Sequence, residues 1–122
     1  MRIFGIDAPE REQLCEHADG SRYGCGQFAR ETMVELIANT PVTCTKRDTD
    51  PYGRMVGVCS GARPDLGAAM VEGGAAVAYR HYSMDYVPQE NLARSLSRGV
   101  WQGRFEAPWD YRHRGQPKPE SK

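Results

Sequence analysis

The sequence predicts an α+β fold, with short strands that can curl into a small barrel. Short apolar segments typical of strands alternate with longer segments of helical periodicity, in the order strand, helix, hairpin, helix, strand, helix. The length of 122 residues favours one domain with a single core. The composition, 39% hydrophobic and 26% charged, is typical of a folded globular protein.

Residues 1–6 are expected to form the first strand, because they are rich in large apolar side chains. Pro9 ends this strand, since proline lacks a backbone donor and disfavours helix at the residue before it. Residues 11–25 are polar and contain glycines, which predicts a loop. A helix is expected over residues 26–38, where one apolar stripe is formed by Ala29, Met33, Leu36 and Ile37.

Two further strands are expected over residues 42–45 and 55–59. The segment between them is polar and rich in turn-forming residues around Pro51, which predicts a hairpin. A short helix over residues 65–72 and a strand of small residues over 75–79 should follow.

A third helix is expected over residues 87–98. Three apolar residues after this helix should fold back onto the core, namely Val100, Trp101 and Phe105. Beyond Trp109 the chain is polar and contains prolines. We therefore expect a domain over residues 1–110 and a flexible polar tail over residues 111–122.

The chain has four cysteines, none in a Cys-x-x-Cys pair, which disfavours a zinc knuckle. An even number in a short chain favours two disulfides, and four cysteines allow three connectivities. We favour local pairing, because Cys15–Cys25 would close the expected loop and Cys44–Cys59 would face each other across the hairpin. The alternative is four buried free thiols in a cytoplasmic protein.

Disulfides would place the protein in an oxidising compartment, secreted or periplasmic. No apolar run approaches the length of a membrane span, and no membrane partner is expected. Met1 leads straight into the first strand, and no signal peptide is visible. An N-terminal portion missing from this chain would reconcile these observations.

The charged residues balance to a formal net charge of zero, so charge alone does not indicate a nucleic-acid-binding protein. The C-terminal end, residues 94–122, is basic. This end could help attract phosphate, but the charge pattern favours the alternative, a solvated charged tail.

Two carboxylates, Asp7 and Glu10, follow the end of the first strand. A hard divalent cation prefers oxygen ligands, and the Asp7 carboxylate with the backbone carbonyl of Ala8 offers two. Glu10 would then be free to position or deprotonate an attacking water. The alternative is a plain turn with capping carboxylates.

Two arginines, Arg2 and Arg54, are candidates for binding phosphate, since a guanidinium matches the geometry of phosphate oxygens. Arg2 precedes Asp7 by five residues, which places the two side chains on opposite faces of a regular strand. A bend or bulge at Gly5 is therefore needed to bring them together. The alternative for each arginine is a surface ion pair.

Three tyrosines are candidates for contacting a base or a sugar, because an aromatic face can stack on either. They are Tyr52, Tyr79 and Tyr82. The alternative is that they are half-buried core residues.

In combination these features resemble the staphylococcal nuclease-like (thermonuclease) family. The segment from Arg2 to Glu10 is followed about forty residues later by Asp50-Pro51-Tyr52-Gly53-Arg54, and Gly99-Val100-Trp101 follows a basic helix. The resemblance covers about residues 1–110. It implies an OB-like, five-stranded β-barrel with three helices, and Ca²⁺-dependent hydrolysis of DNA and RNA phosphodiesters.

The resemblance also implies roles for particular residues. Arg2 and Arg54 would hold the phosphate and stabilise the pentavalent transition state, and Glu10 would act on the water. Asp7 and the Ala8 carbonyl would ligate calcium. The remaining substrate-binding residues implied are Asp50 and Tyr52 at the phosphate end and Tyr79 and Tyr82 beside the nucleotide.

The chain departs from the family pattern at two places. The family usually has a strand pair, with a second calcium-binding Asp, before the segment where this chain begins, so the barrel is expected to be incomplete at its N-terminal end. Pro51 stands where relatives often have a basic residue. We therefore expect a nuclease, impaired if those strands are lost, and hold as the alternative a non-catalytic nucleic-acid or protein interaction module. The protein should be a monomer with strand edges that can pair.

Overall fold

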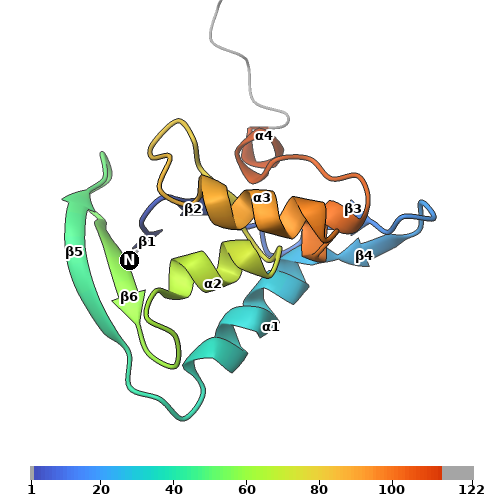
Figure 1. Ribbon diagram of the computed structural model, residues 1–122. Coiled ribbons are helices and arrows are strands. Elements are labelled where there is room, and N and C mark those ends of the chain that lie inside the picture. Colours follow the sequence, from blue (N-terminus) through green and yellow to red (C-terminus); the bar gives the residue numbers. More distant parts are fainter. Residues whose placement is uncertain (1, 114–122) are drawn as a thin grey trace, which may run out of the picture.

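The computed structural model of the protein describes residues 2–113 (Figure 1). In chain order its elements are β1 (Arg2–Ile3), β2 (Ile6–Asp7), β3 (Leu14–Glu16), β4 (Arg22–Gly24), α1 (Cys25–Ile37), β5 (Thr43–Thr49), β6 (Met55–Ser60), α2 (Leu66–Glu72), β7 (Val77–Ala78), α3 (Val87–Ser95), the 3₁₀ helix η1 (Gly99–Gln102) and α4 (Pro108–Arg112).

The described strands form three small sheets. In the largest, β6 lies between β1, which is parallel to it, and β5, which is antiparallel to it. The other two sheets are the antiparallel pairs β2–β7 and β3–β4. The predicted α+β class is confirmed, and the arrangement is consistent with an OB-like fold, although the strands within residues 2–113 do not close into a barrel.

The first predicted strand is interrupted at Gly5, which has a φ of 74°. Before this point β1 pairs with β6, and after it β2 pairs with β7. A Cβ atom at Gly5 would lie 3.0 Å from the ring of Tyr86, so the backbone conformation and the packing both favour glycine. The bend that the sequence analysis required between Arg2 and Asp7 is therefore present.

Two strands differ from their predicted extent. Residues 11–25, expected to be a loop, contain the β3–β4 hairpin, and β5 continues to Thr49 instead of ending near residue 45. Most side chains of β5 are exposed on both faces, and β3 and β4 have three residues each. Such strands lack the alternation of buried and exposed residues that marks a strand in sequence.

The three predicted helices are present, and α2 lies between α1 and α3 (Figure 1). Asp65 caps α2 by accepting a hydrogen bond from the backbone N–H of Ala68. The helices cover a core that includes Met70, Val71 and the small residues around β7. Small side chains at Ala75, Ala76 and Ala78 allow β7 to pack closely beneath the helices.

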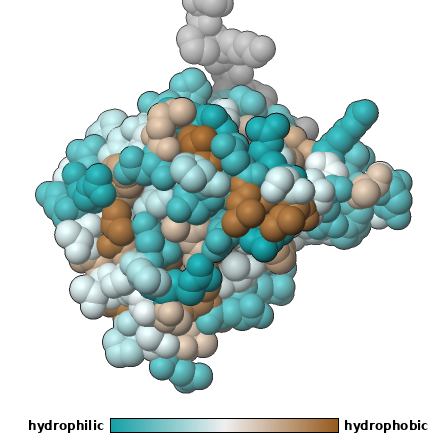
Figure 2. Space-filling model, in the orientation of Figure 1, coloured by the Kyte–Doolittle hydropathy of each residue, from teal (hydrophilic) through white to brown (hydrophobic). Residues whose placement is uncertain are grey.

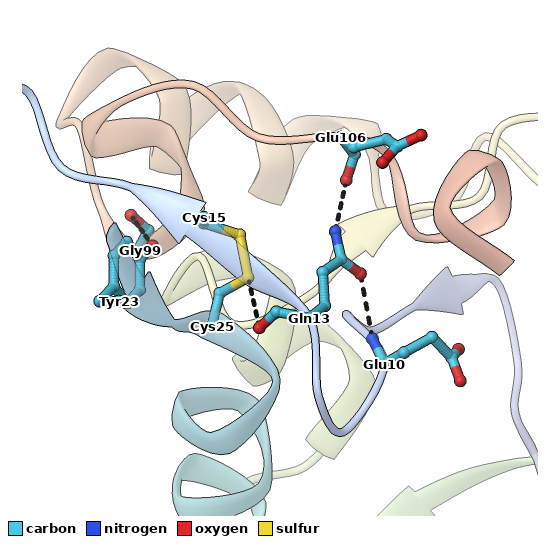
Figure 3. The surroundings of a disulfide bond; sticks show 7 residues. All are labelled: Glu10, Gln13, Cys15, Tyr23, Cys25, Gly99 and Glu106. Atoms are coloured by element: carbon cyan, nitrogen blue, oxygen red, sulfur yellow. Dashed lines mark hydrogen bonds between the residues drawn. A yellow bond between two sulfur atoms is a disulfide. The ribbon is translucent and has the colours of Figure 1, made fainter. Parts of the chain in front are cut away.

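A second buried cluster lies around the first disulfide and contains Cys15, Cys25, Val77 and Val100. Three aromatic residues pack against it, namely Trp101, Phe105 and Trp109. The predicted return of the segment after the third helix onto the core is therefore confirmed. Both predicted disulfides are present, Cys15–Cys25 (Figure 3) and Cys44–Cys59 across the β5–β6 hairpin.

The C-terminal segment is more ordered than the sequence indicated. Tyr111 and Arg112 belong to α4, where the flexible tail was expected to begin at residue 111. Pro108 is buried at the start of this helix. The remainder of the predicted tail, residues 114–122, lies outside the described residues.

The visible face of the molecule is largely hydrophilic, with apolar side chains in separate small spots (Figure 2). Among the described residues, no helix combines the length and apolar character needed to cross a bilayer.

Candidate active site

A groove of about 660 Å³ brings together residues that are distant in sequence. The five residues predicted to carry catalysis and metal binding all line it, namely Arg2, Asp7, Ala8, Glu10 and Arg54. They come from β1, β2, the segment after β2 and the turn between β5 and β6. Because Gly5 bends the chain, Arg2 and Asp7 reach the same groove despite their odd spacing.

The acidic side of this groove is held by the core. Asp7 is only 4% exposed and its backbone pairs with Val77 of β7. Glu10 lies three residues after β2 and begins the turn that ends at Gln13, and the start of α1 packs directly on its backbone. A Cβ atom at Gly26 would lie 1.8 Å from the Glu10 carbonyl oxygen, so only glycine fits there.

Gln13 fixes the position of Glu10. This side chain is fully buried, and its Oε1 accepts a hydrogen bond of 3.1 Å from the Glu10 backbone N–H. Its Nε2 donates a hydrogen bond of 2.8 Å to the Glu106 carbonyl (Figure 3). The Gln13 carbonyl also accepts a hydrogen bond from the Gly26 N–H. Gln13 therefore joins Glu10 to α1 and to the C-terminal segment.

The basic side of the groove is a self-contained turn organised by Asp50. The carboxylate accepts hydrogen bonds from the backbone N–H groups of Tyr52 and Arg54 and, at 2.7 Å, from Arg54 Nε. Gly53 has a φ of 82° and donates its N–H to the Asp50 carbonyl. Asp50 thus fixes both the turn and the direction of the Arg54 guanidinium.

These contacts also set the charge of Asp50. Partial desolvation by the turn opposes ionisation, but the hydrogen bonds from Arg54 and Tyr52 outweigh it and hold the pKa of Asp50 below its usual range. The carboxylate is therefore charged at neutral pH.

A second groove of about 520 Å³ adjoins the first, and Arg2 lines both. Two of the three predicted tyrosines, Tyr79 and Tyr82, line this second groove. Tyr82 donates a hydrogen bond of 2.5 Å from its hydroxyl to Asp48, which lowers the pKa of Asp48 and raises that of Tyr82. Tyr52 lines neither groove; it is 83% exposed and its ring lies 5.5 Å from the Arg54 guanidinium.

Arg112 occupies the acidic side of the first groove, and the sequence analysis did not identify it. Its guanidinium donates two hydrogen bonds to Asp7, of 2.9 and 2.7 Å, and one of 2.7 Å to Glu10. The bonds to Asp7, with those to Glu10, raise the pKa of Arg112 above its usual range. The basic C-terminal end was the one sequence signal that pointed to this region. No sequence signal indicated Gln13, because it is a polar residue in a segment expected to be a loop.

The oxygens around Arg112 are of the type that a divalent cation prefers. Two carboxylates and the Ala8 carbonyl offer hard oxygen donors. The guanidinium of Arg112 lies on these carboxylates, which shows that the position favours positive charge. Among residues 2–113 there is no cluster of three or more acidic, histidine or cysteine side chains suited to a metal. The donor set fits a hard cation such as calcium in charge and type, although it supplies fewer than three side-chain ligands.

The protein is a small α+β domain in which carboxylates and arginines line one groove. A sequence model of the family described as staphylococcal nuclease homologue matches residues 1–103. The chain belongs to this family, and its resemblance to the family is confirmed.

Similar proteins come from several bacteria. The chain is 35% identical to an uncharacterized endonuclease of Escherichia coli O157:H7, over 93% of this chain and 71% of that protein. It is 33% identical to the micrococcal nuclease of Shigella flexneri, over 92% of this chain and 67% of that protein. It is also 30% identical to the succinoglycan biosynthesis protein ExoI of Rhizobium meliloti (strain 1021), over 87% of this chain and 57% of that protein.

Proposed function

We propose that this protein is a calcium-dependent nuclease that hydrolyses phosphodiester bonds of DNA, RNA or both. The observation that supports this function best is the convergence of Arg2, Asp7, Glu10 and Arg54 on one groove. A carboxylate pair facing two arginines supplies the charges that phosphodiester hydrolysis requires. Membership of the nuclease family and the relatives named as nucleases support the same conclusion.

In the proposed reaction, Arg2 and Arg54 bind the non-bridging phosphate oxygens and stabilise the charge that develops on them. Glu10 orients the attacking water and accepts its proton. Asp7 and the Ala8 carbonyl are the proposed calcium ligands, and calcium would supply positive charge to the phosphate. Asp50 acts indirectly, because it directs Arg54 into the groove.

The second groove is the proposed site for the nucleotide next to the scissile phosphate. Tyr79 and Tyr82 line it, and their rings can pack against a base or a sugar. Arg2, shared by both grooves, would connect the nucleotide to the phosphate. Tyr52 is proposed to act at the phosphate end, where its exposed ring lies over Arg54.

The two disulfides are consistent with an oxidising compartment, and we propose a secreted or periplasmic location. We also propose that the protein acts as a monomer whose strand edges can pair with another chain.

The test is an assay of the protein as its gene encodes it, on DNA and on RNA, with added calcium or with EGTA. We expect EGTA-sensitive cleavage that Glu10→Gln reduces by roughly 10²- to 10⁴-fold. Glu12→Gln is the matched control, because Glu12 is an exposed glutamate two residues away and should leave the rate unchanged. No cleavage with calcium, or an unchanged rate for Glu10→Gln, would overturn the proposal.

A second candidate function, a non-catalytic nucleic-acid-binding or protein-binding module, is favoured by one observation. Arg112 already engages both oxygens of Asp7 and one of Glu10, so the two carboxylates have a cationic partner within the chain. This function predicts salt-sensitive nucleic-acid binding, or binding of a protein, without cleavage.

A further inference from the structure

The acidic side of the groove already holds a cation, and that cation belongs to the chain itself. The Arg112 guanidinium lies between the two carboxylates, with both of its terminal nitrogens on Asp7 and one of them also on Glu10. Asp7 is almost fully buried, so its charge needs a partner within the protein. Arg112 is that partner among the described residues.

The fold delivers this guanidinium to the groove. The segment before α4 is tied to the hairpin strand β3 by the Glu16 N–H, which donates to the Arg104 carbonyl at 2.8 Å, and to Gln13 through the Glu106 carbonyl. Within α4, Pro108 is buried and the Trp109 ring lies 5.2 Å from that of Tyr79. The helix is therefore anchored at several points.

The Arg112 side chain is freer than the helix that carries it. One third of the side chain is exposed, so the guanidinium can leave the carboxylates by rotating about its own bonds while α4 stays in place. The carboxylate lone pairs that accept these hydrogen bonds are the ones a divalent cation would use. The guanidinium and a cation on Asp7 therefore exclude each other, and displacement of the guanidinium also releases Glu10.

We propose that Arg112 is a tethered competitor of the divalent cation, which holds Asp7 and Glu10 together when no cation is bound and is displaced when one binds. The inference deepens the proposed function and rests on its cation site. It assigns Arg112 a positioning role, because the residue keeps two neighbouring carboxylates from repelling each other. The competition should lower the affinity of the site for calcium.

The test measures calcium binding to the intact protein by titration calorimetry, with calcium alone as the probe. We expect Arg112→Gln to bind calcium at least about tenfold more tightly than the unchanged protein, because no guanidinium has to be displaced. Arg104→Gln is the matched control: it removes the same charge from the same segment, and Arg104 is exposed. Its calcium affinity should equal that of the unchanged protein.

A second measurement needs no substitution. The guanidinium N–H signals of Arg112, observed by NMR, should be protected from exchange without calcium and should lose that protection as calcium is added. Equal or weaker calcium binding by Arg112→Gln would overturn the inference. If that variant does not fold, the unchanged protein still tests the inference. Retained protection of Arg112 at saturating calcium, or no calcium binding at all, would overturn it.

These outcomes are distinct from those of the cleavage assay. Tighter calcium binding by Arg112→Gln in a protein that cleaves nothing would support the inference and refute the nuclease. Calcium-dependent cleavage, together with a calcium affinity that Arg112→Gln leaves unchanged, would support the nuclease and refute the inference.

Discussion

The two sides of the groove are built in opposite ways. The acidic side, Asp7 to Glu10, is held by residues far along the chain, because β7, the start of α1 and the C-terminal segment all contact it. The basic side, Asp50 to Arg54, is held almost entirely by itself, through hydrogen bonds that Asp50 accepts within its own turn.

The two sides of the groove therefore depend on different parts of the molecule for their geometry. The acidic side is held by the core, so substitutions at distant core residues should change the positions of its carboxylates. The basic side depends on one carboxylate and one turn, so substitutions in this turn should leave the rest of the fold unchanged. Three predictions test this contrast.

The largest effect should come from adding a methyl group to one glycine on each side. Gly26→Ala places a Cβ atom against the Glu10 carbonyl and should lower the free energy of unfolding by about 3 kcal/mol or more. At Gly53 an added Cβ atom would have no other atom within 4 Å. Gly53→Ala should therefore lower the free energy of unfolding only through the positive φ, by about 1–2 kcal/mol. Urea unfolding would measure both, and equal midpoints for the two variants would contradict the contrast.

A smaller effect is expected at Gln13. Gln13→Ala removes hydrogen bonds to Glu10 and Glu106 from a fully buried position and should cost about 1–3 kcal/mol. The matched control, Gln27→Ala, removes only a surface hydrogen bond to Glu31 and should cost well under 1 kcal/mol.

Cleavage should separate these two variants as well. The rate of Gln13→Ala should fall even under conditions where the protein is fully folded, because Glu10 loses its backbone anchor. Thermal unfolding and a cleavage assay on the same samples would show this, and equal rates for the two variants would contradict a positioning role for Gln13.

The smallest effect is the pH dependence of the basic side. The folded pKa of Asp50 lies below its usual value of about 3.9, so its hydrogen bonds stabilise the turn above that pH and are lost as pH falls through the folded pKa. The amide signals of Tyr52 and Arg54 should report this loss by NMR. These amide signals should not change over this pH range in Asp50→Asn. A titration midpoint at or above the usual aspartate pKa would contradict the lowered pKa of Asp50.

Local chemistry made much of this site predictable. Short segments around Asp7 and Asp50 carry their own turn signals, and the odd spacing of Arg2 and Asp7 already required the bend found at Gly5. The cysteine pairing followed from a hairpin whose strands could be recognised.

The parts that the sequence did not reveal depend on tertiary contacts. Gln13 is held by a hydrogen bond to Glu106, 93 residues away, and Arg112 reaches Asp7, 105 residues away, so no local motif identifies either residue. Strands β3 and β4 have only three residues each, and the outer part of β5 is exposed, so these segments carry no periodic signal. α4 has five residues, too few for helical periodicity to be recognised.

The self-contained turn has a consequence for protein engineering. A five-residue unit that folds around its own aspartate can be exchanged, lengthened or grafted without repacking the interior. Position 51 is exposed, and its proline ring fixes φ at the second residue of the turn. Because Pro51 also lines the second groove, another turn-compatible residue here should change that groove while the carboxylates of the first groove keep their geometry.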